Sequence, residues 1–204
     1  WKGNWMRIYI ETLGCPKNVS DSEYAAGLLT EAGHAMVSDP GEAEAIIVNT
    51  CGFINDAKEE SIDRILKLAK EKPEDGILIV SGCLSQRYGE ELGNALPEVD
   101  ILIGVNEYHT LPQILSEYER GRQKLFFNSY EKEYSEISAR ASLGVSYSSY
   151  LKIAEGCDNV CAYCVIPSIR GSYRSRKKEN ILEEARRLAE KGCKELILVA
   201  QDVT

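Results

Sequence analysis

The sequence predicts an α/β fold with a mainly parallel sheet, followed by the beginning of a second α/β unit. Two observations carry this prediction. Short apolar runs of strand length alternate with longer segments of helical periodicity along most of the chain. This alternation breaks once, between about residues 121 and 149, where Ser, Tyr and Glu replace the aliphatic residues, and it then resumes. We therefore expect two domains joined by a connector.

The expected strands are short runs rich in Ile, Val and Leu, at 7–12, 45–49, 77–81, 101–104, 150–154 and 195–200. The expected helices lie between them, at about 21–32, 57–71, 85–92, 110–119 and 179–191. In the second helix, apolar residues recur at i, i+3, i+4 and i+7, which predicts one face packed on the sheet. These residues are Ile62, Ile65, Leu66 and Ala69. The first helix is expected to begin near Ser20 and Asp21 and to stop at Gly33.

These elements divide the chain into expected domains. An N-terminal domain covers 6–120, the connector covers 121–149, and a second domain covers 150–204. Residues 1–5 belong to no pattern and are interpreted as a leader or as residues added for expression. The second domain offers only two strands and one helix, and a sheet of two strands cannot bury its faces. We therefore expect this domain to be incomplete.

Composition and charge exclude several classes of function. The chain has 204 residues, 44% of them hydrophobic, which is enough for a sizeable core without cross-links. No apolar run approaches the length that crosses a bilayer, so we expect no membrane function. The net charge of −8 disfavours binding to a phosphate backbone, so nucleic acid is not an expected partner of this chain. Seven cysteines are an odd number, and without a secretory signal they indicate a reducing, cytoplasmic location.

Three cysteines, Cys15, Cys51 and Cys83, each come directly after one of the first three predicted strands. Because the carboxyl ends of parallel strands lie along one edge of a sheet, where α/β folds bind ligands, these thiols should meet in space. Three thiolates without a fourth partner suit an iron–sulfur cluster with one open iron better than structural zinc, which takes four ligands. Cysteine is among the residues most often buried in a protein core, which would explain one such cysteine. Three cysteines that each directly follow a strand favour a cluster.

A second set of cysteines forms a C-x₃-C-x₂-C loop after the predicted strand 150–154, and it consists of Cys157, Cys161 and Cys164. Zinc sites usually need a further downstream pair. The one remaining cysteine, Cys193, follows a predicted helix, where we interpret it as a packing thiol. The loop also lacks the fourth ligand of the ferredoxin spacing, so one iron is again left open.

This spacing, with the aromatic Tyr163 just before the last cysteine, resembles the radical S-adenosylmethionine superfamily. The resemblance implies that the open iron binds the amino and carboxylate groups of S-adenosylmethionine. It also implies that an electron from the cluster cleaves this cofactor to a 5′-deoxyadenosyl radical. Tyr163 would then be a cofactor-binding residue that lies against the adenine.

Within that superfamily, a chain with two three-cysteine sets in this order resembles the methylthiotransferase family. The matching stretches lie at 12–18, 21–23, 82–88, 97–100, 150–157, 166–171, 174–176 and 198–202, and the resemblance covers 6–204. Cys-Pro-Lys-Asn at 15–18 favours the branch that acts on a ribosomal protein over the branch that acts on tRNA, where Cys-Gln-Met-Asn is usual. Val160 departs from the family, which commonly has a basic residue there, and Val19-Ser20 replaces a usual Leu-Val.

The resemblance implies an enzyme that adds a methylthio group to the β-carbon of an aspartate in the twelfth small-subunit ribosomal protein. It implies two [4Fe–4S] clusters, S-adenosylmethionine and an electron donor such as flavodoxin or ferredoxin. The loop cysteines 157, 161 and 164 would hold the radical-generating cluster, and cysteines 15, 51 and 83 an auxiliary cluster that carries the sulfur. No further catalytic side chain is expected. The second domain would be the opening βα unit of a partial (β/α) barrel, so the chain alone is expected to be inactive.

Three other readings stay open: a tRNA adenosine methylthiotransferase, a simple iron–sulfur electron carrier, and a non-catalytic cluster-binding fragment. An electron carrier would not need two open irons. The dense basic run formed by Arg170, Arg174, Arg176, Lys177 and Lys178 also has two interpretations. It could contact an anionic group of a substrate or cofactor, or it could be a solvated entry to the last helix.

Overall fold

The computed structural model describes residues 5–118, 124–126, 140–141 and 147–203. Its larger part is a parallel sheet of six strands in the order β2-β1-β3-β4-β5-β6. The strands are β1 Arg7–Thr12, β2 Ala35–Met36, β3 Ala45–Thr50, β4 Ile77–Gly82, β5 Ile101–Ile103 and β6 Lys124–Phe126. This confirms the predicted α/β class with a parallel sheet.

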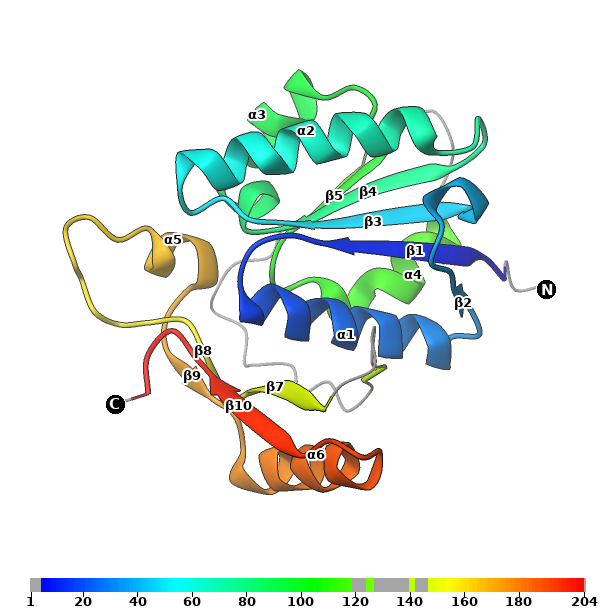
Figure 1. Ribbon diagram of the computed structural model, residues 1–204. Coiled ribbons are helices and arrows are strands. Elements are labelled where there is room, and N and C mark those ends of the chain that lie inside the picture. The colour runs from blue at the N-terminus through cyan, green and yellow to red at the C-terminus, as the bar shows by residue number, and fades with distance from the viewer. Residues whose placement is uncertain (1–4, 119–123, 127–139, 142–146, 204) are drawn as a thin grey trace.

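Helices cover both faces of this sheet (Figure 1). They are α1 Pro16–Glu31, α2 Asn55–Glu71, α3 Cys83–Ala95 and α4 Leu111–Glu117, with short 3₁₀ turns at Pro40–Glu42 and Tyr108–Thr110. Apolar residues of α1 and α4 form one core with the sheet, and those of α2 and α3 form the other. Strands β3 and β4 are buried along their whole length, as expected of central parallel strands covered on both faces.

The register of the central strands decides where the cysteines lie. Thr50, the last residue of β3, pairs with Gly82, the last residue of β4. Cys51 and Cys83 therefore leave the sheet side by side. Thr12 of β1 pairs with Asn49 of β3, so the β1–α1 loop with Cys15 ends at the same edge.

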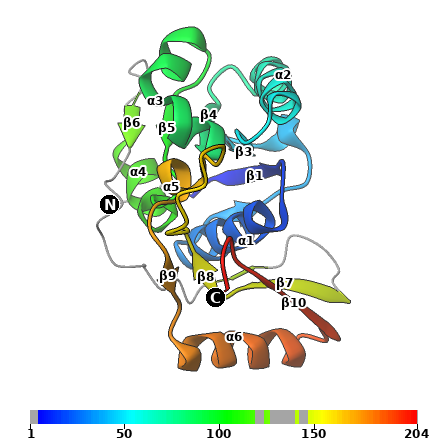
Figure 2. The same ribbon diagram turned by 90° about the vertical axis from the view of Figure 1, so that its left-hand side faces the viewer.

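The second part of the chain is smaller and lies against α1. Its elements are β7 Ser148–Lys152, β8 Ala154–Glu155, α5 Ile166–Arg170, β9 Arg174–Ser175, α6 Lys178–Glu190 and β10 Glu195–Val199. Strands β7 and β10 pair in parallel, and β8 pairs with β9 in antiparallel fashion. The β7–β10 pair lies between α1 and α6, as Figures 1 and 2 both show. A small apolar cluster of Leu151, Leu188 and Cys193 joins this pair to α6.

The structure corrects several expected boundaries. Helix α1 begins at Pro16 rather than near Ser20, because proline is well suited to the first turn of a helix and Cys15 serves as its N-cap. Gly33 follows the end of α1 with a φ of +94°, as expected of a stop signal. Strand β6 lies inside the predicted connector 121–149, most of which is outside the described residues. The strand expected at 150–154 is divided in the structure between β7 and β8, which begins at Ala154. The short elements β2, α5 and β9 were not predicted, since none of them shows periodicity.

None of the helices in the described part of the chain is both long and apolar enough to cross a membrane.

Candidate functional site

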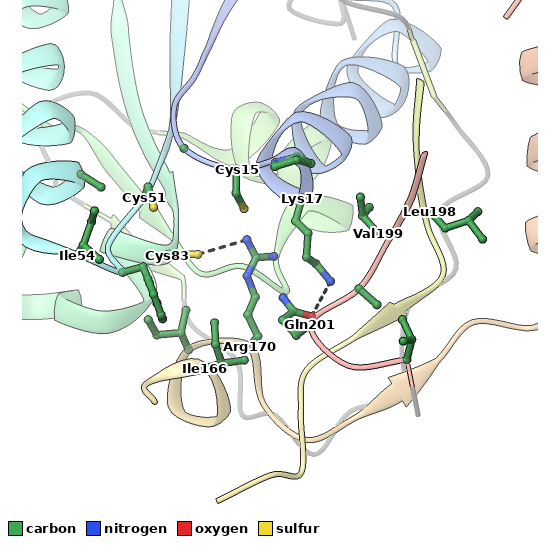
Figure 3. A pocket seen from close by; sticks show the side chains of 17 residues that line it. Cys15, Lys17, Cys51, Ile54, Cys83, Ile166, Arg170, Leu198, Val199 and Gln201 are labelled. Atoms are coloured by element: carbon green, nitrogen blue, oxygen red, sulfur yellow. Dashed lines mark hydrogen bonds between the residues drawn. The ribbon is translucent and has the colours of Figure 1, made fainter. Parts of the chain in front are cut away.

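Cys15, Cys51 and Cys83 line one cavity of about 630 Å³ at the carboxyl edge of the large sheet (Figure 3). The structure therefore brings together the three thiols that the sequence placed after separate strands. Elements of the second part of the chain close the opposite wall, through Ile166 and Arg170 of α5 and through residues that follow β10. The cavity thus lies between the two parts of the chain.

Two glycines allow the cysteine-bearing loops to approach each other. Gly14 has a φ of +91°, and a Cβ at this position would lie 2.6 Å from Cys51 Cβ and 3.1 Å from Cys51 Sγ. Gly82 has a φ of +93°, and a Cβ there would lie 2.4 Å from the Thr50 carbonyl oxygen. A larger residue at either position would push the cysteines apart.

Buried amides hold these loops in place. Asn18 Nδ2 donates to the carbonyl oxygens of Leu13, at 2.7 Å, and Thr50, at 3.1 Å. Asn49 Nδ2 donates in turn to the carbonyl oxygen of Asn18 at 2.9 Å. The two amides therefore tie the loop that carries Cys15 to the end of β3, directly before Cys51.

Two of the thiols lie at helix N-termini, where backbone N–H groups favour negative charge. Cys15 is the N-cap of α1, and Cys83 is the first residue of α3. Burial raises the pKa of the Cys83 thiol, and the guanidinium of Arg170 opposes this shift. A metal bound at this thiol would remove the remaining barrier to deprotonation.

The three thiols reach the cavity from segments that follow three different strands. Among the described residues, no three His, Cys, Asp or Glu side chains gather closely enough to hold one metal ion. In a cluster each thiolate binds a different iron, so the ligands stand around a shared cavity instead. The three thiols around this cavity fit that requirement.

The second cysteine set lies on the loop between β8 and α5, which extends away from the body of the molecule (Figure 1). Cys157 and Cys164 are half-buried, whereas Cys161 is exposed. Tyr163 is 90% exposed. These cysteines do not line the cavity, but the loop leads directly into α5, which does. Whether they bind a cluster, and whether Tyr163 contacts a cofactor, stays a prediction.

A buried ionic layer joins α1 to the second part of the chain, and it consists of Lys17, Asp21, Lys152, Glu155 and Arg170. Asp21 accepts from Lys152 Nζ at 2.5 Å and from Arg170 Nη1 at 2.7 Å. Glu155 lies 3.0 Å from Lys17 Nζ and 3.2 Å from Lys152 Nζ. Three cations thus face two carboxylates, which leaves the layer positively charged beside the cysteine cavity.

The layer shifts the protonation of its members. Burial lowers the pKa of Lys17 to about 8, and the nearby Glu155 opposes this effect. Burial alone would raise the pKa of Glu155, but Lys152, Arg170 and Lys17 hold it well below its usual range. Gln201, just after β10, accepts from Lys17 Nζ at 2.6 Å and donates to Glu155 at 2.9 Å. The carboxyl end of β10 is thereby fixed to the residue two positions after Cys15.

Sequence reasoning missed this layer and left the basic run 170–178 open. Arg170 and Arg176 are only 2% and 5% exposed, so a solvated helix entry is wrong for these two. Arg176 pairs with Glu184 at 2.6 Å instead. Lys177 and Lys178 are exposed, as that interpretation required. The available signal was the run of polar residues at 17–23 inside a helix, all but Val19 buried here.

Comparisons with known proteins identify both parts of the chain. Residues 7–104 match the Uncharacterized protein family UPF0004, and residues 151–204 match the Radical SAM superfamily. The chain is 47% identical over 201 residues to the ribosomal protein uS12 methylthiotransferase RimO of Clostridioides difficile (strain 630). The match covers 98% of this chain and 45% of that protein. The protein of the same name from Anaeromyxobacter sp. (strain K) is 48% identical, with 97% and 42% covered.

The chain therefore spans less than half the length of these curated relatives. Among solved structures, it is similar to the radical S-adenosylmethionine methyltransferase TsrM of Kitasatospora setae, with a TM-score of 0.66 and 10% identity. That match covers 96% of this chain and 47% of TsrM. The S-adenosylmethionine radical enzyme OxsB matches with a TM-score of 0.60 and 13% identity, over 98% of this chain and 34% of OxsB. These two likenesses establish the fold alone.

The two matched domains follow one another in the same order as the two three-cysteine sets. The identity to the curated relatives agrees with this arrangement. The chain therefore joins a part that matches family UPF0004 to a part that matches the Radical SAM superfamily, and nearly its whole length is similar to curated ribosomal protein uS12 methylthiotransferases.

Proposed function

We propose that this protein is a radical S-adenosylmethionine methylthiotransferase that adds a methylthio group to the β-carbon of an aspartate in ribosomal protein uS12. The observation that carries the proposal is the convergence of Cys15, Cys51 and Cys83 on one cavity beside the radical-enzyme part of the chain. The identity of 47% to relatives named for this activity supports the choice of substrate.

In this proposal cysteines 15, 51 and 83 bind an auxiliary [4Fe–4S] cluster, and cysteines 157, 161 and 164 bind a second [4Fe–4S] cluster. When bound, these clusters and S-adenosylmethionine supply a radical strong enough to break an unactivated C–H bond and a sulfur for the new C–S bond. A side-chain base could not remove that hydrogen at neutral pH, so the proposal assigns no catalytic acid or base to the chain. The chain's own part is to hold, orient and enclose these groups.

The lining of the cavity suits this task. Phe53, Ile54, Leu198 and Val203 give it apolar walls, and these side chains are themselves exposed to solvent. Lys17 and Arg170 bring positive charge to the same space, which favours anionic thiolates and sulfur species. The cavity therefore combines an apolar surface with a local positive charge.

The exposed loop with Cys157, Cys161 and Cys164 would contact both S-adenosylmethionine and the electron donor. The ring of Tyr163 offers a stacking surface for the adenine of S-adenosylmethionine, directly before Cys164. Exposure of Cys161 would place the cluster of this loop within reach of an electron donor such as flavodoxin or ferredoxin. A net charge of −8 suits a basic ribosomal protein better than a tRNA backbone.

The experiment that tests the proposal compares two substrates in a strain that lacks the gene. Mass spectrometry should find that uS12 has lost its methylthio group while tRNA adenosines keep their modifications. A variant gene with Cys15, Cys51 and Cys83 all changed to Ala should fail to restore the modification, and the Cys193→Ala gene should restore it. An unmodified tRNA nucleoside beside normally modified uS12 would overturn the assignment and favour the tRNA branch.

A further inference from the structure

Arg170 connects the two cysteine sets. It is the last residue of α5, six positions after Cys164, and its side chain reaches back to Cys83. Its Nη2 lies 3.3 Å from Cys83 Sγ (Figure 3). The same nitrogen lies 2.9 Å from Asn18 Oδ1. Its Nη1 lies 2.7 Å from Asp21 Oδ2. One guanidinium thus contacts a cluster thiol and two residues of α1.

We propose that Arg170 is a positioning residue that raises the reduction potential of the auxiliary cluster by donating to the thiolate of Cys83. The proposal rests on the proposed function, since it needs a cluster on cysteines 15, 51 and 83. It adds a role that neither the cysteine pattern nor the family match assigns. It also explains why a guanidinium is buried at this position.

The direction of the effect follows from charge. One-electron reduction makes an iron–sulfur cluster more negative, so a hydrogen bond to a ligand sulfur and a nearby positive charge both stabilise the reduced state. The donor is charged, which makes the hydrogen bond about twice as strong as a neutral one. Burial keeps solvent from screening the guanidinium, which is only 2% exposed.

The carboxylates near Arg170 do not cancel its positive charge. Asp21 at 2.7 Å and Glu155 at 3.6 Å face its Nη1. Both carboxylates are also paired with Lys152, and Glu155 with Lys17, so they do not neutralise Arg170 alone. Nη2 is directed to Asn18 and Cys83. Lysine could supply the charge but not the planar fork that serves Asp21 and Cys83 together.

The test uses the chain with Cys157, Cys161 and Cys164 changed to Ala, so that only the auxiliary set can bind a cluster. Its midpoint potential is measured by anaerobic redox titration followed by electron paramagnetic resonance. Into this background we would introduce Arg170→Met, Arg170→Lys and, as a matched control, Arg176→Met. Arg176 is a second buried arginine of the same segment, but it pairs with Glu184 and Tyr24 instead.

Arg170→Met should lower the midpoint potential by at least 59 mV, the equivalent of a tenfold change in the ratio of reduced to oxidised cluster. Arg170→Lys should lower it by less, and Arg176→Met should leave it unchanged. An unchanged potential in Arg170→Met at full iron content would overturn the proposal. So would an equal shift in Arg176→Met, which would indicate general loosening.

Two further outcomes keep the proposals separate. Removal of Arg170 leaves Asp21 with one fewer partner, so Arg170→Met could fail to fold. In that case the double variant Asp21→Asn with Arg170→Met is compared with Asp21→Asn alone, because loss of the Asp21 carboxylate by itself raises the potential. A lower potential in the double variant than in Asp21→Asn supports the proposal, and equal potentials refute it. If the parent chain without the loop cysteines binds no iron, the proposed auxiliary cluster itself is wrong.

Discussion

The close approach of the two cysteine loops makes Gly14→Ala a sharp test of the site. The new methyl group would lie 2.6 Å from Cys51 Cβ, whereas carbon atoms pack at about 3.5–4.0 Å. One of the loops must therefore move by roughly 1 Å, which costs about 1–3 kcal/mol in a packed site. Alanine at a φ of +91° adds backbone strain of about 1–2 kcal/mol. We expect Gly14→Ala to lose about 2–5 kcal/mol of unfolding free energy.

Gly33→Ala is the matched control, because Gly33 has a similar φ of +94° and nothing lies within 4 Å of its added Cβ. It should show the backbone strain alone, about 1–2 kcal/mol. Urea unfolding of the two apo variants gives the difference, and anaerobic reconstitution gives the iron content. Gly14→Ala should bind about half of the iron that Gly33→Ala binds, since Cys51 is displaced. Equal stability losses and equal iron contents would refute the close packing of Gly14 against Cys51.

Three further predictions concern the surroundings of the site. Gln201→Ala should lower the unfolding free energy by about 1–3 kcal/mol in urea titrations, because Lys17 and Glu155 lose a buried partner. The control Gln113→Ala removes an exposed hydrogen bond to Glu117 and should lower it by less than about 0.5 kcal/mol. Cys193→Ala should leave the iron content unchanged, because this thiol packs against Leu151 and Leu188, and a drop in iron would show that it is a ligand. Tyr163→Ala should weaken binding of S-adenosylmethionine to the reconstituted chain in equilibrium dialysis, whereas the control Tyr147→Ala, which removes another exposed tyrosine, should not. Unchanged affinity in Tyr163→Ala would remove Tyr163 from the cofactor site.

The sequence predicted those features that depend on neighbouring residues. The strands β1, β3 and β4 are apolar runs bounded by polar residues, and the amphipathic spacing in α2 marks its buried face. Because all these strands are parallel, the position of each cysteine after its strand was enough to predict that three thiols meet. This part of the site follows from periodicity and topology alone.

The ionic layer could not be predicted in the same way. Asp21 and Arg170 are 149 residues apart, and Lys17 and Gln201 are 184 residues apart. Nothing in the local pattern of a charged residue shows whether a distant segment will cover it. Helix α5, which carries Arg170, has five residues and therefore too few turns to show a buried face. The burial of Arg170 became visible only once the two parts of the chain were packed together.

The measurement that tests the central claim most directly is the iron content of three forms of the chain after anaerobic reconstitution. The unaltered chain should bind about eight irons, as two four-iron clusters. The variant with Cys15, Cys51 and Cys83 changed to Ala should bind about four, and so should the variant with Cys157, Cys161 and Cys164 changed to Ala. If either triple variant binds as much iron as the unaltered chain, those three cysteines do not hold a cluster and the account of the site is wrong.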